Sequence, residues 1–479
     1  MPLLRRSVGL WIGLTVWAAA CGAPADDPAG EGIPPGAAAA ERASALLGAL
    51  LDSAWARDLE TSPIIRLREG LDVERLPNLG YEEAEDRAAF FQRQLDRALA
   101  IDGAALSAEE RVTLETVRRQ AEIAVEGHRY FWLRSVLTPY SSVLRSYSQI
   151  FPLLPLEDEE DLDRFVSLVE RVPSHVRDLE GYVRGQFERD FIVSSQNLAP
   201  VIQLVRATAG EAEGGPFALP ADRAAGLDPD RVAEARARIG EIVRDSINPA
   251  LEELAAFLEG PYTARAPAGV GLSQYPEGRD YYLYLTRLHT TMEVTPAEAQ
   301  AAGHELLAEF RRRMADIRDR LGSEGSAESF HEHLKTDPRY FPTSFLGFEA
   351  GVYEDLYSEY GFYILESFLA TRLVVDPGMN YFSMTREEAR QFMRENTLES
   401  ETRIATESLR YSTDLPGQAL AYQMGKRKLL ELRARAEDAL GDGFDIRGFH
   451  DVVLRNGSVP MVVLEGQVDA WIDAEGGGR

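Results

Sequence analysis

The stretch TPAEAQAAGHELLAEFRRRMADIRDRL, Thr295–Leu321, contains both the start signal and the apolar stripe of a long amphipathic helix. Thr295 is a favoured N-cap residue, Pro296 suits the first helical position, and Glu298 stands at the third. Apolar side chains then recur at the spacing of one helix face, as Leu306, Leu307, Phe310, Met314, Ile317 and Leu321. The stretch therefore predicts a helix that buries this face.

The same pattern recurs along most of the chain. Ser107 and Glu110 have the spacing of a capping box, and Thr385 stands at another helix start. Alternation of apolar and polar residues, which would indicate strands, is scarce. We therefore predict a mainly α-helical fold, a large two-lobed domain with little or no sheet. Further helices are predicted over residues 157–187, 231–258 and 416–440, and two short ones over 445–472.

Residues 207–230 are rich in glycine and proline, as a loop would be. We interpret this loop as a waist between two lobes, residues 41–206 and 231–479. Residues 259–279 are predicted to form a second loop.

The charge of the chain bears on its partners. Its 479 residues carry a formal net charge of -27. An acidic surface repels phosphate backbones and gives none of the counterion release that drives nucleic-acid binding. We therefore predict no nucleic-acid partner.

The amino terminus resembles a bacterial lipoprotein signal. Arg5 and Arg6 are followed by the apolar run Val8–Ala20, which is too short to span a membrane, and then by Cys21. Cleavage before Cys21 and lipid on its thiol would anchor the chain to a membrane of the cell envelope. Gly22 in place of an aspartate favours the outer membrane, with the protein facing the periplasm. The alternative is an ordinary secretory signal with an incidental cysteine.

The first forty residues would then divide into two parts. Residues 1–20 are the signal peptide, and residues 21–40 are small, proline-rich and without apolar periodicity, which is typical of a disordered tether. The folded domain is predicted to comprise residues 41–479.

Three stretches carry a resemblance to a known family. They are Gly271–Glu298, with Arg287-Leu288-His289-Thr290-Thr291 at its centre; Arg372–Gly378; and Pro416–Ile472, which ends in FDIRGFHDVVLRNGSVPMVVLEGQVDAWI. Together they resemble the bacterial family known as domain of unknown function 885, from about residue 41 to the end.

The resemblance implies a zinc metallopeptidase of the gluzincin kind. Members are expected to carry a His-Glu pair, then Gly-His-His on a helix, and later a glutamate in a Glu-Gly-Trp context. Imidazoles and a carboxylate hold zinc with one open position, and a further glutamate serves as general base for the metal-bound water.

None of these motifs is present in this sequence. No two of the seven histidines are adjacent, and Glu-Gly-Trp does not occur. The family pattern breaks off and resumes within TDPRYFPTSFLGFEAGVYEDLY, Thr336–Tyr357, so we infer that a central segment with every expected ligand is missing at a seam over residues 337–355. Asn380 also stands where the resemblance implies an active-site histidine. We expect no cofactor.

The remaining metal candidates are weak. His304-Glu305 begins like HExxH but lacks the second histidine, and the alternative is a histidine on a helix surface. His331 and His333 point about 200° apart if they lie on a helix, so they cannot both face one ion there. We favour an exposed helix end for this pair.

Four residues are candidate relics of the implied cleft. By the resemblance Arg372, Gln418 and Tyr422 line it, and an arginine there could grip a substrate carboxylate. Tyr422 shares a helix stripe with Leu429, so packing alone could also explain it. His289 could support the substrate, but we favour a hydrogen-bonded histidine that fixes the next loop.

Three functions remain open on the sequence. The first is an envelope lipoprotein that has lost zinc chemistry and binds a peptide or serves a structural role. The second is an active zinc peptidase with rebuilt ligands. The third is a truncated, non-functional family member.

Overall fold

The computed structural model describes residues 35–210, 214–336 and 355–476, and within these ranges the chain is helical without a strand. The predicted mainly α fold is confirmed. Residues 1–34, with Cys21, and residues 337–354, with most of the predicted seam, lie outside the described residues.

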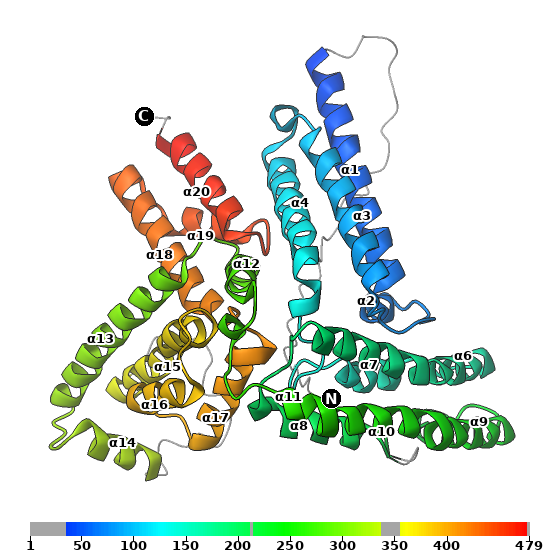
Figure 1. Ribbon diagram of the computed structural model, residues 1–479. Helices are drawn as coiled ribbons and strands as arrows, with labels where there is room; N and C mark the ends of the chain where they lie inside the picture. The colour runs from blue at the N-terminus through cyan, green and yellow to red at the C-terminus, as the bar shows by residue number, and fades with distance from the viewer. Residues whose placement is uncertain (1–34, 211–213, 337–354, 477–479) are drawn as a thin grey trace.

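The amino-terminal helices form a three-helix arm (Figure 1). The arm comprises α1 (Pro35–Thr61), α3 (Tyr81–Leu99) and α4 (Ala108–Gly127). Its small core contains Leu47, Leu50 and Leu114. Helix α1 begins at Pro35, whereas the disordered tether was predicted to extend to residue 40. The last six residues of the predicted tether are therefore helical.

The middle of the chain builds the largest core. Its helices are α2 (Pro63–Arg68), α5 (Leu144–Ile150), α6 (Glu159–Glu170), α7 (Val172–Glu188), α8 (Ser195–Thr208), α9 (Pro229–Ile242) and α10 (Asn248–Phe257). Residues 157–187 were predicted to form a single helix, but they form two. The first helix ends at its cap residue Arg171, shortly before Pro173, because proline cannot continue the hydrogen bonds of the helix before it.

The predicted boundary between the lobes was wrong. Buried residues of α9 and α10, such as Ile239 and Leu254, share one core with residues of α6 and α7, such as Phe165 and Leu179. Phe217, from the glycine-rich loop, is buried in the same core. The loop is therefore packed inside the first lobe, because its apolar side chains and those of α9 and α10 bury surface there.

The second predicted loop was partly wrong, because the helix continues beyond residue 258. One π-helical turn (Val243–Ile247) precedes α10, and another (Leu258–Tyr262) leads into α11 (Thr263–Arg265). Pro249 and Pro261 lie at these turns. Proline lacks a backbone N–H, so a wider turn lets the helix pass it without ending.

The rest of the chain forms the second group of helices. They are α12 (Gly278–Thr290), α13 (Pro296–Arg320), α14 (Ala327–Thr336), α15 (Leu356–Asn380), α16 (Arg386–Asn396), α17 (Glu401–Leu409), α18 (Leu420–Leu440), α19 (Ile446–Leu454) and α20 (Met461–Gly476). Helices α13 and α15 cross closely at Gly303, where a Cβ atom would lie 2.7 Å from Val374 Cγ2. Helix α15 is the central element, because α13, α16 and α18 all pack on it (Figure 1).

The helices on either side of the predicted seam pack on each other. Tyr360, near the start of α15, is fully buried with Ile317 of α13 and Phe330 of α14. Its hydroxyl lies 3.1 Å from Arg318 Nη1 and 2.6 Å from His331 Nε2. The core is therefore closed at this point.

Candidate functional site

The last turns of α15 carry a buried carboxyl group. Asp376 lies inside the apolar run Leu373–Pro377 and has no exposed surface. The Tyr282 hydroxyl of α12 donates to Asp376 Oδ1 at 2.9 Å, and the Gly417 N–H donates to both carboxyl oxygens, at 2.9 and 3.1 Å. One carboxyl group therefore joins α12, α15 and the turn before α18.

Asn380 extends this network by one helical turn. Its Nδ2 donates to Asp376 O at 3.0 Å, to Asp376 Oδ1 at 3.2 Å and to Tyr411 O at 2.9 Å. Its Oδ1 accepts from the Leu272 N–H at 3.0 Å. The side chain implied to replace a histidine is thus a fully buried bridge between three segments.

The electrostatics of this network follow from burial. Burial raises the pKa of Asp376 to about 7, although hydrogen bonds from Gly417, Tyr282 and Asn380 oppose the rise. Burial, and next the charge of Asp376, hold the pKa of Tyr282 well above its usual value. Tyr282 therefore remains a hydrogen-bond donor at physiological pH.

Arg372 lies one turn before Asp376 and is 6% exposed. Its Nη2 is 3.4 Å from Glu407 Oε2, and Glu407 also accepts a short hydrogen bond from the Tyr411 hydroxyl. Its guanidinium stacks on the Phe368 ring, 4.2 Å from the ring centre. Its Nε is buried without a hydrogen-bond partner among the described residues, which leaves one donor of this cation unused.

Gln418 and Tyr422, the next two predicted relics, lie around the same cluster. Gln418 is 3% exposed and accepts a hydrogen bond from Arg410 Nη2 at 3.1 Å, while Arg410 Nη1 lies 3.6 Å from Glu407. The Tyr422 ring is 5.8 Å from the Arg372 guanidinium and 48% exposed. The structure therefore brings Arg372, Gln418 and Tyr422 together, and Tyr422 is too exposed to be explained by core packing alone.

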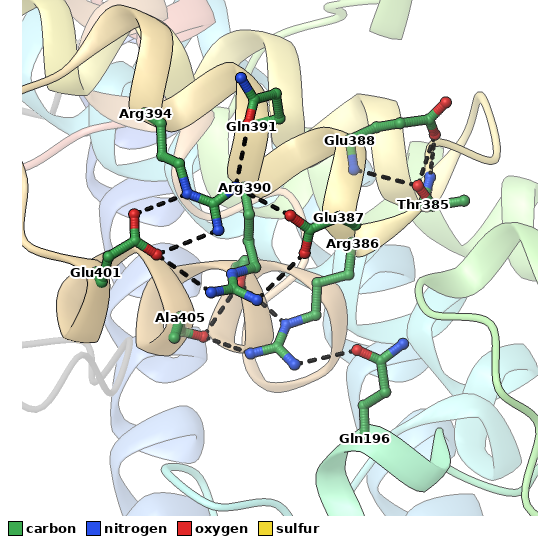
Figure 2. Close-up of polar contacts among 11 residues, drawn as sticks. Gln196, Thr385, Arg386, Glu387, Glu388, Arg390, Gln391, Arg394, Glu401 and Ala405 are labelled. Carbon is green, nitrogen blue, oxygen red and sulfur yellow. Dashed lines mark hydrogen bonds and ion pairs between the residues drawn. The ribbon is translucent and has the colours of Figure 1, made fainter.

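Helix α17, which presents Glu407, is fixed to α16 by ion pairs. Figure 2 shows Arg390 and Arg394 of α16, each between Glu387 and Glu401. Arg386 reaches further, to Ala405 O at 2.8 Å and to Gln196 Oε1 of α8 at 3.1 Å. A single exposed ion pair contributes little to the free energy of unfolding. Here both arginines share the carboxylates of Glu387 and Glu401, and such a network restricts the position of α17 relative to α16.

His289, the fourth predicted relic, lies apart on α12. It is partly buried, and its Nδ1 has no hydrogen-bond partner among the described residues. Burial lowers its pKa to about 4, so the imidazole is neutral at physiological pH. The favoured interpretation, a hydrogen-bonded histidine that fixes the next loop, therefore finds no support at Nδ1.

The metal candidates do not fit zinc. His304 is exposed and packs edge-on against Phe392, while Glu305 is 3.0 Å from Arg427. His331 faces Tyr360 from α14, and His333 is exposed two residues further on the same helix. Within the described ranges, no three His, Cys, Asp or Glu side chains are grouped so that they could hold an ion.

Sequence reasoning missed three members of the site: Asp376, Tyr282 and Glu407. Asp376 had a visible signal, because a carboxylate inside an apolar run is rare unless it is buried with partners. Tyr282 lies 94 residues from Asp376 in sequence, so no local pattern connects the two. Glu407 has no distinguishing signal in the sequence.

The solved structures that resemble this fold include two bacterial proteins. One, the crystal structure of "the putative lipoprotein from Colwellia psychrerythraea", has a TM-score of 0.77 and 18% identity, and the match covers 91% of this chain and 100% of that one. The other, "a putative lipoprotein of unknown function from Shewanella oneidensis", has a TM-score of 0.61 and 13% identity, with 88% and 99% covered. Both show the fold alone.

Family membership rests on the sequence. No curated protein matches this chain. Among the described helices, none is both long and apolar enough to cross a membrane. The family model described as "Bacterial protein of unknown function (DUF885)" matches residues 63–345 and 343–468. Because these two segments include most of the chain, the protein belongs to this bacterial family of unknown function.

Proposed function

We propose that this chain is a lipid-anchored protein of the cell envelope that binds peptide ends without zinc-dependent hydrolysis. The observation that carries the proposal is the state of Asp376 and Asn380. Their polar atoms are occupied by hydrogen bonds to Tyr282, Gly417 and Leu272. Side chains committed to such bonds inside the core hold helices together and are not available as metal ligands.

The lipid anchor is supported by the sequence and by the relatives. Cys21, the only cysteine, directly follows three alanines at the end of the apolar run. The solved structures from Colwellia psychrerythraea and Shewanella oneidensis are both described as putative lipoproteins. Gly22, in place of an aspartate after the cysteine, supports our proposal that the chain is anchored in the outer membrane and faces the periplasm.

The peptide ligand is supported by the cluster around Arg372. Arg372 and Arg410 share the single carboxylate of Glu407, so neither arginine has an ion pair of its own among the described residues. The exposed ring of Tyr422 lies beside it. A terminal carboxylate could bind Arg410 and Arg372, with an adjacent side chain against the Tyr422 ring.

The loss of a central segment is supported by the family match and by the packing. The family model matches in two segments that meet at residues 343–345, within the predicted seam. Tyr360 closes the core where α14 and α15 flank this seam. A chain that has adapted to the loss would have such a closed core, whereas a recent accidental truncation would expose apolar surface there.

The first test is the metal content of the full-length chain, purified without chelator. We expect less than about a tenth of a zinc ion per chain, together with a cooperative thermal transition, since the candidate ligands are paired or dispersed. About one zinc per chain would refute the non-catalytic part of the proposal.

The second test concerns the ligand. A fluorescein-labelled mixture of random nonapeptides with free carboxyl ends is compared with the same mixture amidated, by fluorescence anisotropy. We expect the free acids to bind more tightly, and Arg410→Gln to remove the difference. Arg433→Gln, at an exposed arginine of α18 paired with Glu437, is the control. Equal binding of acids and amides would refute the carboxylate contact.

A further inference from the structure

Three donors of the candidate site meet at one oxygen atom of Glu407. Arg372 Nη2 lies 3.4 Å from Glu407 Oε2, and Arg410 Nη1 lies 3.6 Å from the same atom. The Tyr411 hydroxyl donates a short hydrogen bond to it as well. Guanidinium and phenol groups are donors that suit a carboxylate. Arg372, Arg410 and Tyr411 therefore form a carboxylate receptor, which holds a carboxylate of the same chain.

Contacts outside this carboxylate hold the receptor in place. The Arg372 guanidinium lies 4.2 Å from the centre of the Phe368 ring, and Arg410 Nη2 donates to Gln418 Oε1 at 3.1 Å. Tyr411 is buried, and burial holds its pKa well above the usual value, so its hydroxyl remains a donor at physiological pH. We therefore expect the receptor to keep its shape when the internal carboxylate leaves.

The two arginines hold the internal carboxylate only loosely. Both distances to Glu407 Oε2 are longer than the about 2.7–2.9 Å of a charge-assisted hydrogen bond. Glu407 belongs to α17, whose Glu401 is paired with Arg390 and Arg394 of α16 (Figure 2), so the backbone of Glu407 is not free to move toward the receptor. The carboxylate of a separate ligand has no such restriction and can approach both arginines.

Helix α17 itself offers Glu407 a second partner. Arg403 stands four residues before Glu407, at the spacing of side chains that are neighbours on one helix face. Its side chain is half-exposed and lies 3.3 Å from Glu399. Its guanidinium is 4.7 Å from the centre of the Phe368 ring, the ring on which Arg372 stacks. A rotation of the Glu407 side chain about its own bonds can therefore exchange one arginine for the other.

We propose that Glu407 is an internal competitor, which occupies the carboxylate receptor until the terminal carboxylate of a peptide displaces it. This inference rests on the proposed binding of peptide ends and adds a regulation of that site. The affinity for peptide is reduced by the fraction of chains in which Glu407 occupies the receptor. A purely structural Glu407 would act in the opposite sense, because its removal would leave the buried Arg372 without a counter-ion and weaken the site.

Fluorescence anisotropy of the full-length chain tests the competitor role, with the fluorescein-labelled random nonapeptides as free acids and as amides. We expect Glu407→Gln to bind the free acids about tenfold more tightly than the wild type, the scale of one charge-assisted hydrogen bond, and to bind the amides as the wild type does. The control is Glu395→Gln, at an exposed glutamate of α16 that accepts from Gln391 at 2.7 Å. It removes the same charge and should leave both affinities unchanged.

The outcomes separate this inference from the peptide site. If the wild type prefers free acids but Glu407→Gln binds them no more tightly, the competitor role is overturned and the peptide site stands. Equal binding of acids and amides by both proteins would refute the carboxylate contact, and the competitor role with it. Equal tightening in Glu395→Gln would assign the gain to net charge and overturn the competitor role.

A second variant applies if Glu407→Gln fails to fold. Arg403→Gln, at a half-exposed side chain, removes the partner that α17 offers to the displaced Glu407. It should weaken the binding of free acids severalfold and leave the amides unchanged. An unchanged affinity for the free acids would overturn the competitor role.

Discussion

Replacing Asp376 by asparagine should change how the stability of this protein depends on pH. The carboxyl group is fully buried, and burial raises its pKa to about 7. In the unfolded chain an aspartate titrates near 3.9. The folded state therefore holds its proton more tightly than the unfolded state, so the stability present below about pH 4 is lost as pH rises toward 7.

The magnitude follows from the difference between these two pKa values. About three units at 1.36 kcal/mol each give a loss of about 4 kcal/mol between pH 4 and pH 7. Asp376→Asn cannot ionise, so it removes this loss. The asparagine keeps one oxygen that can accept from Tyr282 or Gly417, but it places an NH₂ group where the second carboxyl oxygen stood. This change lowers the free energy of unfolding by about 1–3 kcal/mol at every pH.

Urea unfolding followed by far-UV circular dichroism, at intervals from pH 4 to pH 8, measures both effects. The free energy of unfolding of Asp376→Asn minus that of the wild type should rise by about 4 kcal/mol across this range. Asp52→Asn, at an exposed aspartate of α1, is the control and should give a flat difference. A flat difference for Asp376→Asn would refute the raised pKa, and with it the interpretation of the carboxyl group as isolated from solvent.

Two further variants and one titration test the packing and the electrostatics. Gly271→Ala should lower the free energy of unfolding by more than about 3 kcal/mol, because φ is +80° and the new Cβ would lie 2.2 Å from Met379 O. The control is Gly240→Ala, in open space on α9, which should be neutral or stabilising in the same thermal melt. Tyr360→Phe removes two hydrogen bonds at the junction of α13, α14 and α15, so it should lower the free energy of unfolding in urea by about 1–3 kcal/mol. A decrease of less than about 0.3 kcal/mol would contradict a closed core at this junction. His289 should remain neutral down to about pH 4 in an NMR titration, and a midpoint above 6 would show that it is solvated.

Local signals predicted the helix starts well. The capping boxes at Ser107 and Thr295 are present, with both reciprocal hydrogen bonds in each, and Thr385 begins α16 in the same way. These signals succeed because a cap depends on residues three positions apart, which the sequence shows directly. Proline was less informative, since Pro261 lies inside a continuous helix where it was taken as part of a loop.

The lobes and the site depend on contacts that no local pattern encodes. The sequence predicts a loop around Phe217, but in the structure this side chain is buried in the core with residues of α6 and α7. The Tyr282–Asp376 bond joins residues 94 positions apart. The resemblance did select Arg372, Gln418 and Tyr422 as neighbours, but it carried no information on Glu407, which fixes Arg372.

Helix α15 connects the two features on which the functional interpretation rests. At its start, Asp355 caps the helix by accepting from the Ser358 N–H at 2.8 Å, and Tyr360 is buried in the core beside α14. At its end, Asn380 bridges three segments. The proposed loss of a central segment would account for the first feature alone, since Asn380 lies beyond it and a single deletion does not substitute a distant residue. The proposed deletion and the proposed substitution would be two independent changes, each accommodated by satisfied hydrogen bonds of one helix. This supports our proposal of a folded protein without zinc chemistry over an accidentally truncated one.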